Sequence, residues 1–124
     1  MRFWPEGGNV YLYLKPVDFR KSIDGLSVVV QTELGQNPSS GDVYLFRSKK
    51  RDKLKALVYS HNSYTLWYRR CEVGKFIFPG ETTGHIELDA AYQQWLLSSH
   101  YYQQLPDMAA QHHEHFYWMK VLYL

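Results

Sequence analysis

Three segments with the composition of β-strands follow one another in the middle of the chain. They are DVYLFR (42–47), KLKALVYS (53–60) and YTLWYRRCE (64–72), and all are rich in aromatic and aliphatic residues. The intervening loops, SKKRD and HNS, are five and three residues long. A parallel connection needs a crossover of roughly a dozen residues or more, so loops this short permit only antiparallel neighbours. The sequence therefore predicts an antiparallel meander at the centre of the fold.

A strand and a helix are expected before this meander. The segment NVYLYL (9–14) is rich in strand-forming residues and follows a Gly-Gly break. Asp18 is a good helix N-cap, and apolar side chains then recur at steps of three or four residues. These positions, which predict an amphipathic helix from Phe19 onward, are Phe19, Ile23, Leu26, Val30 and Leu34.

The order of elements after the meander completes the predicted architecture. HIEL (85–88) is expected to form a short strand, and Asp89 to cap a helix over AAYQQWLLSS (90–99). The whole pattern predicts an α+β fold, a single domain with a mainly antiparallel sheet, one helix after the first strand and one helix after the last. We assign residues 1–98 to this domain and 99–124 to an atypical C-terminal extension, partly helical after the start signal at Pro106 and Asp107.

Composition restricts the classes of protein to which the chain can belong. The N-terminus lacks the features of a signal peptide, and no run approaches the roughly 18 apolar residues needed to span a membrane. We therefore expect a cytoplasmic protein without membrane contact. Cys71 is the one cysteine of the 124 residues, which excludes an internal disulfide and a zinc site built from several cysteines. We expect Cys71 to pack as a small apolar residue, and we predict no cofactor.

The net charge of +2 conceals a basic central region. Between Lys15 and Lys75 there are twelve Lys or Arg and six Asp or Glu, a balance of +6, whereas the flanks have a balance of −4. Binding to a polyanion depends on local potential, so the centre of the chain is the candidate binding region. Six cations lie within nine positions around the first hairpin loop, namely Arg47, Lys49, Lys50, Arg51, Lys53 and Lys55.

The predicted hairpin would gather these cations on one surface. Its loop would carry three of them into solvent, and Lys53 and Lys55 would share one face of the second strand. If the next strand pairs so that the numbers of facing residues have an even sum, Trp67 and Arg69 lie on that face. Further candidates for nucleic-acid binding are Arg70, at the end of that strand, and Arg20 and Lys21, expected on the first helical turn. The alternative is a solvated surface, because edge lysines also block unwanted strand pairing.

Two other groups of residues suggest chemistry less strongly. His112 and His115 would share a helix face, which suits a transition metal, but the spacing differs from that of the zinc-protease motif. We predict no metal site there. Asp18 and Asp24 would supply two carboxylates for a metal-dependent nuclease, although no third ligand is evident nearby. A helix cap at Asp18 and an ion pair at Asp24 explain these two residues more simply.

The order of the motifs resembles that of a known family. DFRKSIDGL (18–26), followed by PSSGDVYLFRSKKRDKLKALVYSHNSYTLWYRRCEVGKFIFP (38–79), is similar to the TnpB-type accessory proteins of the insertion-sequence-sixty-six family. The resemblance covers roughly residues 9–98. Matching residues are Asp18, Arg20, Lys21, Asp24, Gly25, Leu26, Pro38, Ser40, Gly41, Phe46, Arg51, Asp52, Lys55, Leu57, Leu66, Arg70, Glu72, Gly74, Phe76 and Pro79.

The resemblance implies a bacterial accessory protein that acts beside a separate transposase. It brings no catalytic residues with it, so we expect a protein without enzymatic activity. DNA, including the ends of the mobile element, and the other proteins of that element are the expected partners, and self-association is left open. The alternative is a protein-interaction module whose aromatic surface docks the transposase, with the basic hairpin facing an acidic patch on it.

Overall fold

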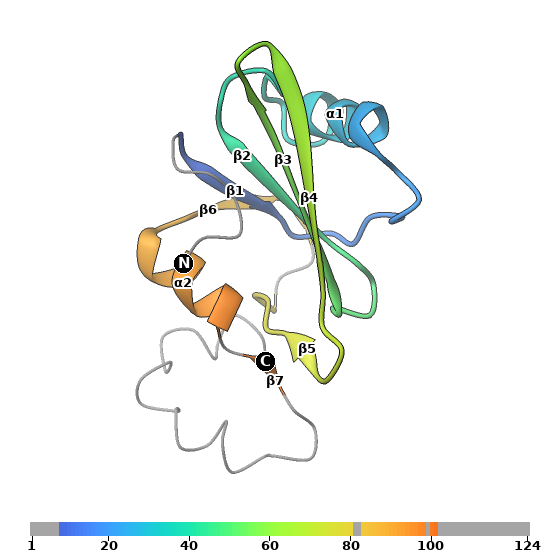
Figure 1. The fold of residues 1–124 in the computed structure, drawn as a ribbon, viewed down its shortest axis with the longest axis vertical. Helices are drawn as coiled ribbons and strands as arrows, with labels where there is room; N and C mark the ends of the chain where they lie inside the picture. The colour runs from blue at the N-terminus through green and yellow to red at the C-terminus, as the bar shows by residue number, and fades with distance from the viewer. Residues whose placement is uncertain (1–7, 81–82, 99, 102–124) are drawn as a thin grey trace.

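A computed structural model describes residues 8–80, 83–98 and 100–101 of the chain (Figure 1). Two helices, α1 (Ile23–Thr32) and α2 (Ala90–Ser98), accompany two sheets. A small ribbon pairs β5 (Lys75–Phe76) with β7 (His100–Tyr101). The large sheet has the order β4-β3-β2-β1-β6. Its strands are β1 (Val10–Tyr13), β2 (Val43–Arg47), β3 (Lys53–Ser60), β4 (Ser63–Arg70) and β6 (His85–Leu88).

The central meander has the predicted antiparallel pairing. β2 pairs with β3, and β3 pairs with β4, in each case in antiparallel orientation. The second hairpin closes through two residues only, His61 and Asn62, which have φ values of 51° and 60°. Positive φ at both central positions is the conformation that tight hairpin turns require, because it matches the twist of the strands. The expected hairpin is thus confirmed, with a loop one residue shorter than predicted.

One parallel pair distinguishes the sheet from a plain meander. β1 lies parallel to β2, and α1 provides the crossover between them, whereas β6 closes the other edge antiparallel to β1. Within the described residues, a five-stranded, mainly antiparallel sheet and two helices in a single small domain confirm the α+β prediction. The expected helices after the first strand and after the last strand of the large sheet are both present.

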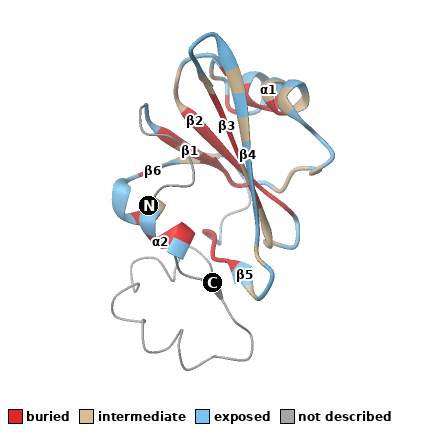
Figure 2. Ribbon diagram, viewed as in Figure 1, coloured by how far each residue is buried: buried red, intermediate tan, exposed pale blue. Residues whose placement is uncertain are grey.

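The two helices lie on opposite faces of the sheet, and each covers its own core (Figures 1 and 2). On the α1 face the buried residues are Tyr13, Leu26, Val29, Val30, Leu34, Tyr44, Phe46 and Leu57. On the α2 face, residues 76–78 pack with α2 against the alternate side chains of the strands. Because side chains alternate along each strand, both faces of the central strands are buried. Figure 2 shows β2 buried along its whole length.

The first helix begins later than the sequence predicts. Ser22 is its N-cap residue and Ile23 its first residue, so the expected start at Phe19 with Asp18 as cap is wrong. The Asp18 carboxylate instead accepts hydrogen bonds from the backbone N–H and the guanidinium of Arg20. Lys21 N–H donates to the Asp18 carbonyl (3.0 Å) and closes a turn. Such local bonding competes with helix formation, so Arg20 and Lys21 precede the helix instead of lying on its first turn.

The end of the chain is described only in part. Asp89 caps α2 as predicted, since its Oδ1 accepts a hydrogen bond from Tyr92 N–H at 2.8 Å. The helix expected after Pro106 and Asp107 and the histidines at 112 and 115 lie outside the described residues. Neither α1 nor α2, the two helices of the described ranges, is long and apolar enough to cross a membrane.

Arg47, predicted to contact nucleic acid, is buried in the fold. Only 4% of its surface is exposed. Its Nε donates to the Leu14 carbonyl (3.0 Å) and its Nη1 to the Ser48 carbonyl (3.3 Å), while the guanidinium lies 5.7 Å from the Phe78 ring centroid. The side chain therefore joins the end of β2 to the chain that leaves β1. We place it in the structural core and not on the binding surface.

We predict that Arg47→Met lowers the free energy of unfolding by about 2–3 kcal/mol, because it leaves the buried Leu14 carbonyl without its charged donor. Chemical denaturation of the purified variant measures this loss. The matched control is Lys49→Met, an exposed cation two residues away, which should change stability by less than about 0.5 kcal/mol. Equal effects of the two substitutions would contradict a structural role for Arg47.

Candidate nucleic-acid interface

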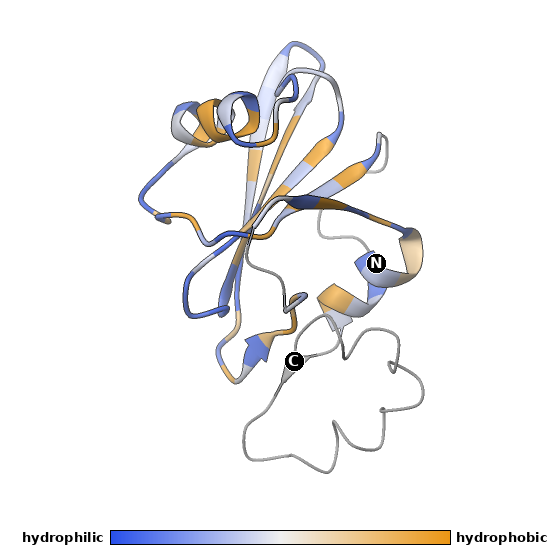
Figure 3. Cartoon of the chain, turned by 180° about the vertical axis from the view of Figure 1, so that it is seen from behind, coloured by the Kyte–Doolittle hydropathy of each residue, from blue (hydrophilic) through white to orange (hydrophobic). Residues whose placement is uncertain are grey.

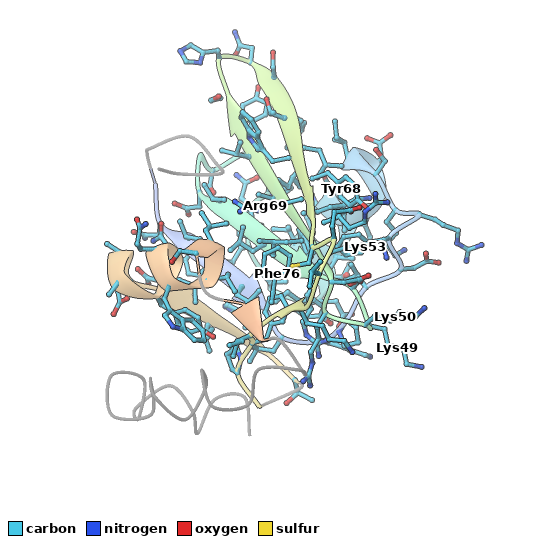
Figure 4. The ribbon with its side chains drawn as sticks, turned by 60° about the horizontal axis from the view of Figure 1, so that its bottom comes forward. Lys49, Lys50, Lys53, Tyr68, Arg69 and Phe76 are labelled. Carbon is cyan, nitrogen blue, oxygen red and sulfur yellow. The ribbon has the colours of Figure 1, made fainter. Side chains whose placement is uncertain are left out.

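The loop between β2 and β3, residues 48–52, is called the basic loop below and has a fixed conformation. Ser48 Oγ donates to Asp52 Oδ1 (3.1 Å) and accepts from Lys53 N–H (3.1 Å). Arg51 N–H donates to the Ser48 carbonyl (3.1 Å), which closes the turn. Lys49 and Lys50 are exposed at its tip and extend away from the protein (Figure 4). The loop is thus preorganised, and its two lysines are available to solvent.

Backbone bonds also attach the basic loop to β5 and to the segment between β4 and β5. The Arg51 carbonyl accepts from Phe76 N–H (2.8 Å), and the Asp52 carbonyl accepts from Cys71 N–H (2.7 Å). Arg51 has a φ of 65°, a left-handed conformation that costs a non-glycine residue about 1–2 kcal/mol. A strained residue persists only where its surroundings determine the conformation, and here hydrogen bonds on both sides do so.

Asp52 is the acidic residue of the basic loop, and it partly neutralises one neighbour. Its carboxylate lies 3.3 Å from Lys53 Nζ. Burial alone would raise the pKa of Asp52, but hydrogen bonds from Ser48 and Lys53 together hold it below its ordinary value. Asp52 is therefore charged at neutral pH, and Lys53 is anchored next to the loop.

The pairing of β3 with β4 decides which side chains share a face with the lysines. Lys53 faces Arg70 and Lys55 faces Tyr68, so the numbers of facing residues have an odd sum. Tyr68 and Arg70 therefore lie on the lysine face, and the expected placement of Trp67 and Arg69 there is wrong. Figure 4 shows Tyr68 and Arg69 on opposite sides of β4. Arg69 instead donates to the Leu97 carbonyl at the end of α2 (3.3 Å).

Lys55 joins β3 to the turn that precedes α1. Its Nζ donates to the carbonyls of Phe19 (2.8 Å) and Lys21 (2.9 Å). The same Nζ lies 4.9 Å from the Phe19 ring centroid and 5.9 Å from that of Tyr68, within the range of cation–π attraction. Burial lowers the pKa of Lys55, and the nearby Asp18 charge opposes that shift. Lys55 thus holds the turn against the sheet.

A pocket lies between this turn and the two strands. It has a volume of about 640 Å³, and its lining combines two aromatic rings with three cations and one carboxylate. The Phe19 and Tyr68 ring centroids are 6.3 Å apart, with their planes inclined by 56°. We call it the aromatic pocket; it is lined by Asp18, Phe19, Arg20, Lys53, Lys55 and Tyr68.

Ion pairs flank the aromatic pocket on the turn and on β4. Arg20 Nη2 lies 2.6 Å from Asp18 Oδ2, and Arg70 Nε lies 2.7 Å from Glu72 Oε2. Hydrogen bonds from the Arg20 guanidinium and backbone lower the pKa of Asp18 to about 2. Exposed ion pairs of this kind contribute little to stability but orient the side chains. Both arginines remain largely exposed to solvent.

The pocket and the basic loop lie on one side of the molecule, and Figure 3 shows the turn and the loop there as largely hydrophilic segments. Arg47, Trp67 and Arg69 are placed elsewhere. The sequence analysis did not identify Phe19 and Tyr68 as candidate binding residues. Alternation along β4 would have placed Tyr68 on the lysine face only if the register between β3 and β4 had been known. We call the resulting set the basic surface: Phe19, Arg20, Lys21, Lys49, Lys50, Arg51, Lys53, Lys55, Tyr68 and Arg70.

Other candidate chemistry has less support in the part of the chain that the structure describes. Within residues 8–80, 83–98 and 100–101, no three His, Cys, Asp or Glu side chains are placed to hold a metal ion. The Asp18 carboxylate is engaged by Arg20. Cys71 packs against the core as expected, and burial raises the pKa of its thiol to about 11, so the thiol is protonated at neutral pH.

Comparison with known proteins adds to this geometry. A family model described as IS66 Orf2 like protein matches residues 8–106. The uncharacterized protein y4jC of Sinorhizobium fredii is 33% identical over 82 residues, which cover 66% of this chain and 70% of the relative. The uncharacterized protein y4hO of the same organism is 29% identical over 96 residues, which cover 76% of this chain and 84% of the relative. No solved structure matches the chain.

We predict that the Asp18 carboxyl titrates at a pH of about 2, and that Arg20→Ala returns its midpoint toward 3.8. Because the folded pKa is depressed, the stabilising contribution is complete above pH 3.8 and disappears as the pH falls through about 2. NMR titration of the side-chain carboxyl measures both midpoints. A midpoint near 3.8 in the unmodified protein would show that Arg20 does not hold this carboxylate in solution.

We predict that Arg51→Gly leaves the free energy of unfolding unchanged or raises it by up to about 1 kcal/mol, since glycine adopts the left-handed conformation without strain. Lys50→Gly is the matched control, because Lys50 lies in the same loop without a positive φ. It should lose about 0.5–1 kcal/mol through the greater freedom of the unfolded chain. Urea denaturation compares the two variants, and similar losses in both would disprove the strain at Arg51.

Proposed function

The chain belongs to the family of IS66 Orf2-like proteins, and from this premise we propose that it is a non-catalytic accessory protein of DNA transposition. It acts beside a separate transposase of the same mobile element and contacts DNA through the basic surface. Its contribution is to neutralise phosphates and to position DNA, while the transposase carries out the chemistry. The preorganised basic loop is the observation that supports DNA contact most directly.

The arrangement of cations suits a phosphate backbone. Lys49 and Lys50 are exposed on a loop whose own hydrogen bonds fix its shape, so little loop ordering would oppose binding. Lys53 and Arg70 face each other at the adjoining end of β3 and β4 and extend the positive charge along the sheet. Phosphate contacts of this kind release counterions and dominate the affinity of proteins for DNA.

A second candidate function is docking of the transposase without DNA contact. The observation that favours it is the position of β4, which forms an edge of the large sheet and is largely exposed. An exposed edge strand is a template for pairing with a segment of another protein. If the basic loop at the same time faces an acidic patch on the transposase, replacing Lys49 and Lys50 with glutamate would disrupt capture of the transposase, and the purified protein would bind no DNA.

We predict that the protein binds duplex DNA and that the double substitution Lys49→Gln and Lys50→Gln makes the salt dependence of binding shallower. If each lysine contacts one phosphate, the slope of log affinity against log salt should decrease by about 0.9 per lysine, or about 1.8 together. Fluorescence anisotropy over a salt series, with the element's terminal repeat and a scrambled duplex, provides the measurement.

Arg69→Gln is the control for this experiment, because Arg69 lies on the opposite face of β4 and donates to Leu97. It should leave the slope unchanged. An equal decrease in slope from Arg69→Gln, or the absence of binding at low salt, would contradict DNA contact through the basic surface. Cleavage of the DNA in the presence of magnesium, abolished by Asp18→Asn with Asp24→Asn, would contradict a non-catalytic role.

A further inference from the structure

We propose that the aromatic pocket binds an unpaired nucleotide, so that the basic surface takes single-stranded DNA in preference to duplex. This inference rests on the proposed function, because it specifies the form of DNA that the same surface binds. It follows from the exposed aromatic ring, from the cations that surround it and from the preformed shape of the pocket.

Tyr68 presents an aromatic surface that the core does not cover. Half of the residue (50%) is exposed, although it lies on the α1 face of the sheet, where Leu57 is fully buried. Bases in a duplex are stacked on one another, so only an unpaired base can lie against such a ring. Stacking on aromatic side chains tolerates every base, because each has a π-face. The Tyr68 ring therefore adds to the affinity for single-stranded DNA but not to the affinity for a duplex.

Cations lie around this ring at positions suited to the phosphates that flank a bound base. Lys55 faces Tyr68 from β3, and Lys53, two residues earlier on the same face, faces Arg70. Arg20 is exposed across the pocket on the turn. Lining cations outnumber the one lining carboxylate, Asp18, by three to one. An aromatic ring within a positively charged groove is the arrangement by which proteins bind single strands without sequence preference.

The pocket is already formed before any ligand binds. Lys55 fixes the turn through the carbonyls of Phe19 and Lys21, and the Asp18–Arg20 pair holds the turn's own conformation. A volume of about 640 Å³ lies in the range of sites that hold small molecules. Because the walls are fixed, binding requires little ordering of the protein.

The basic loop continues the surface from the pocket. The facing pair of Lys53 and Arg70 lies directly between the loop and the ring, since β3 begins where the loop ends. Figure 4 shows Tyr68, Lys53, Lys50 and Lys49 along one side of the molecule. A strand with one base against Tyr68 would therefore extend its backbone past Lys53 toward the tip lysines.

The test compares oligonucleotides that have the same phosphates and differ in their bases. Fluorescence anisotropy at low salt measures binding of an oligomer of about twelve thymidines, within the site sizes of single-strand binding proteins, and of an abasic oligomer of the same length. We expect the thymidine oligomer to bind about tenfold or more tightly than the abasic one, and Tyr68→Leu to remove that difference. Tyr68→Leu should lower affinity for the thymidine oligomer by a larger factor than affinity for a duplex of the same length, because a duplex offers no unpaired base to the ring.

Two variants control for non-specific effects of the substitution. Trp67→Leu removes the neighbouring aromatic residue from the opposite face and should preserve the preference for bases, as should Tyr68→Phe, which keeps the ring. If Tyr68→Leu fails to fold, quenching of a 2-aminopurine base within the oligomer reports stacking on the unmodified protein. Equal affinity for thymidine and abasic oligomers, or no quenching, would overturn the proposal.

The outcomes also separate this proposal from the proposed function. Duplex binding that depends on Lys49 and Lys50, together with equal affinity for the thymidine and abasic oligomers, would overturn the aromatic pocket and leave DNA contact standing. Binding of neither duplex nor single strands at low salt would overturn both.

Discussion

The ammonium group of Lys55 connects the parts on which the candidate interface depends. It donates to two backbone carbonyls of the turn before α1, at Phe19 and Lys21, and it lies against the rings of Phe19 and Tyr68. The wall of the aromatic pocket therefore depends on this side chain of β3 together with the backbone bond from Val17 N–H to the Arg47 carbonyl, whereas Asp18 positions Arg20.

The cations near the first hairpin have different physical roles although they are close in sequence. Arg47 is buried and holds the chain that leaves β1, Lys55 holds the turn, and Lys53 is paired with Asp52. Lys49 and Lys50 extend into solvent from a loop that is held by its own hydrogen bonds. The cations with structural roles thus position the exposed ones. The result is a preorganised surface, although the sequence alone shows only a run of positive charges.

Much of the fold follows from local patterns, whereas the composition of the interface depends on register. Short loops predicted the meander, and Asp89 was recognised as a cap from its residue type directly before the helical segment. In the structure its side chain accepts from Tyr92 N–H. Asp18 has the same residue type but bonds to Arg20, and no local rule distinguishes the two cases. A shift of one residue in the pairing of β3 with β4 would put Trp67 on the lysine face in place of Tyr68. That register depends on the two-residue turn at His61 and Asn62.

The central claim is that DNA binds the side of the molecule that carries the basic loop and the aromatic pocket. Titration of the isotopically labelled protein with DNA, followed by amide NMR, tests it most directly. We expect the largest shifts at residues 48–53, at Phe19 and at Tyr68, with little change in α2 and β6 on the opposite side. Shifts concentrated in α2 and β6, or no shifts at low salt, would contradict the account.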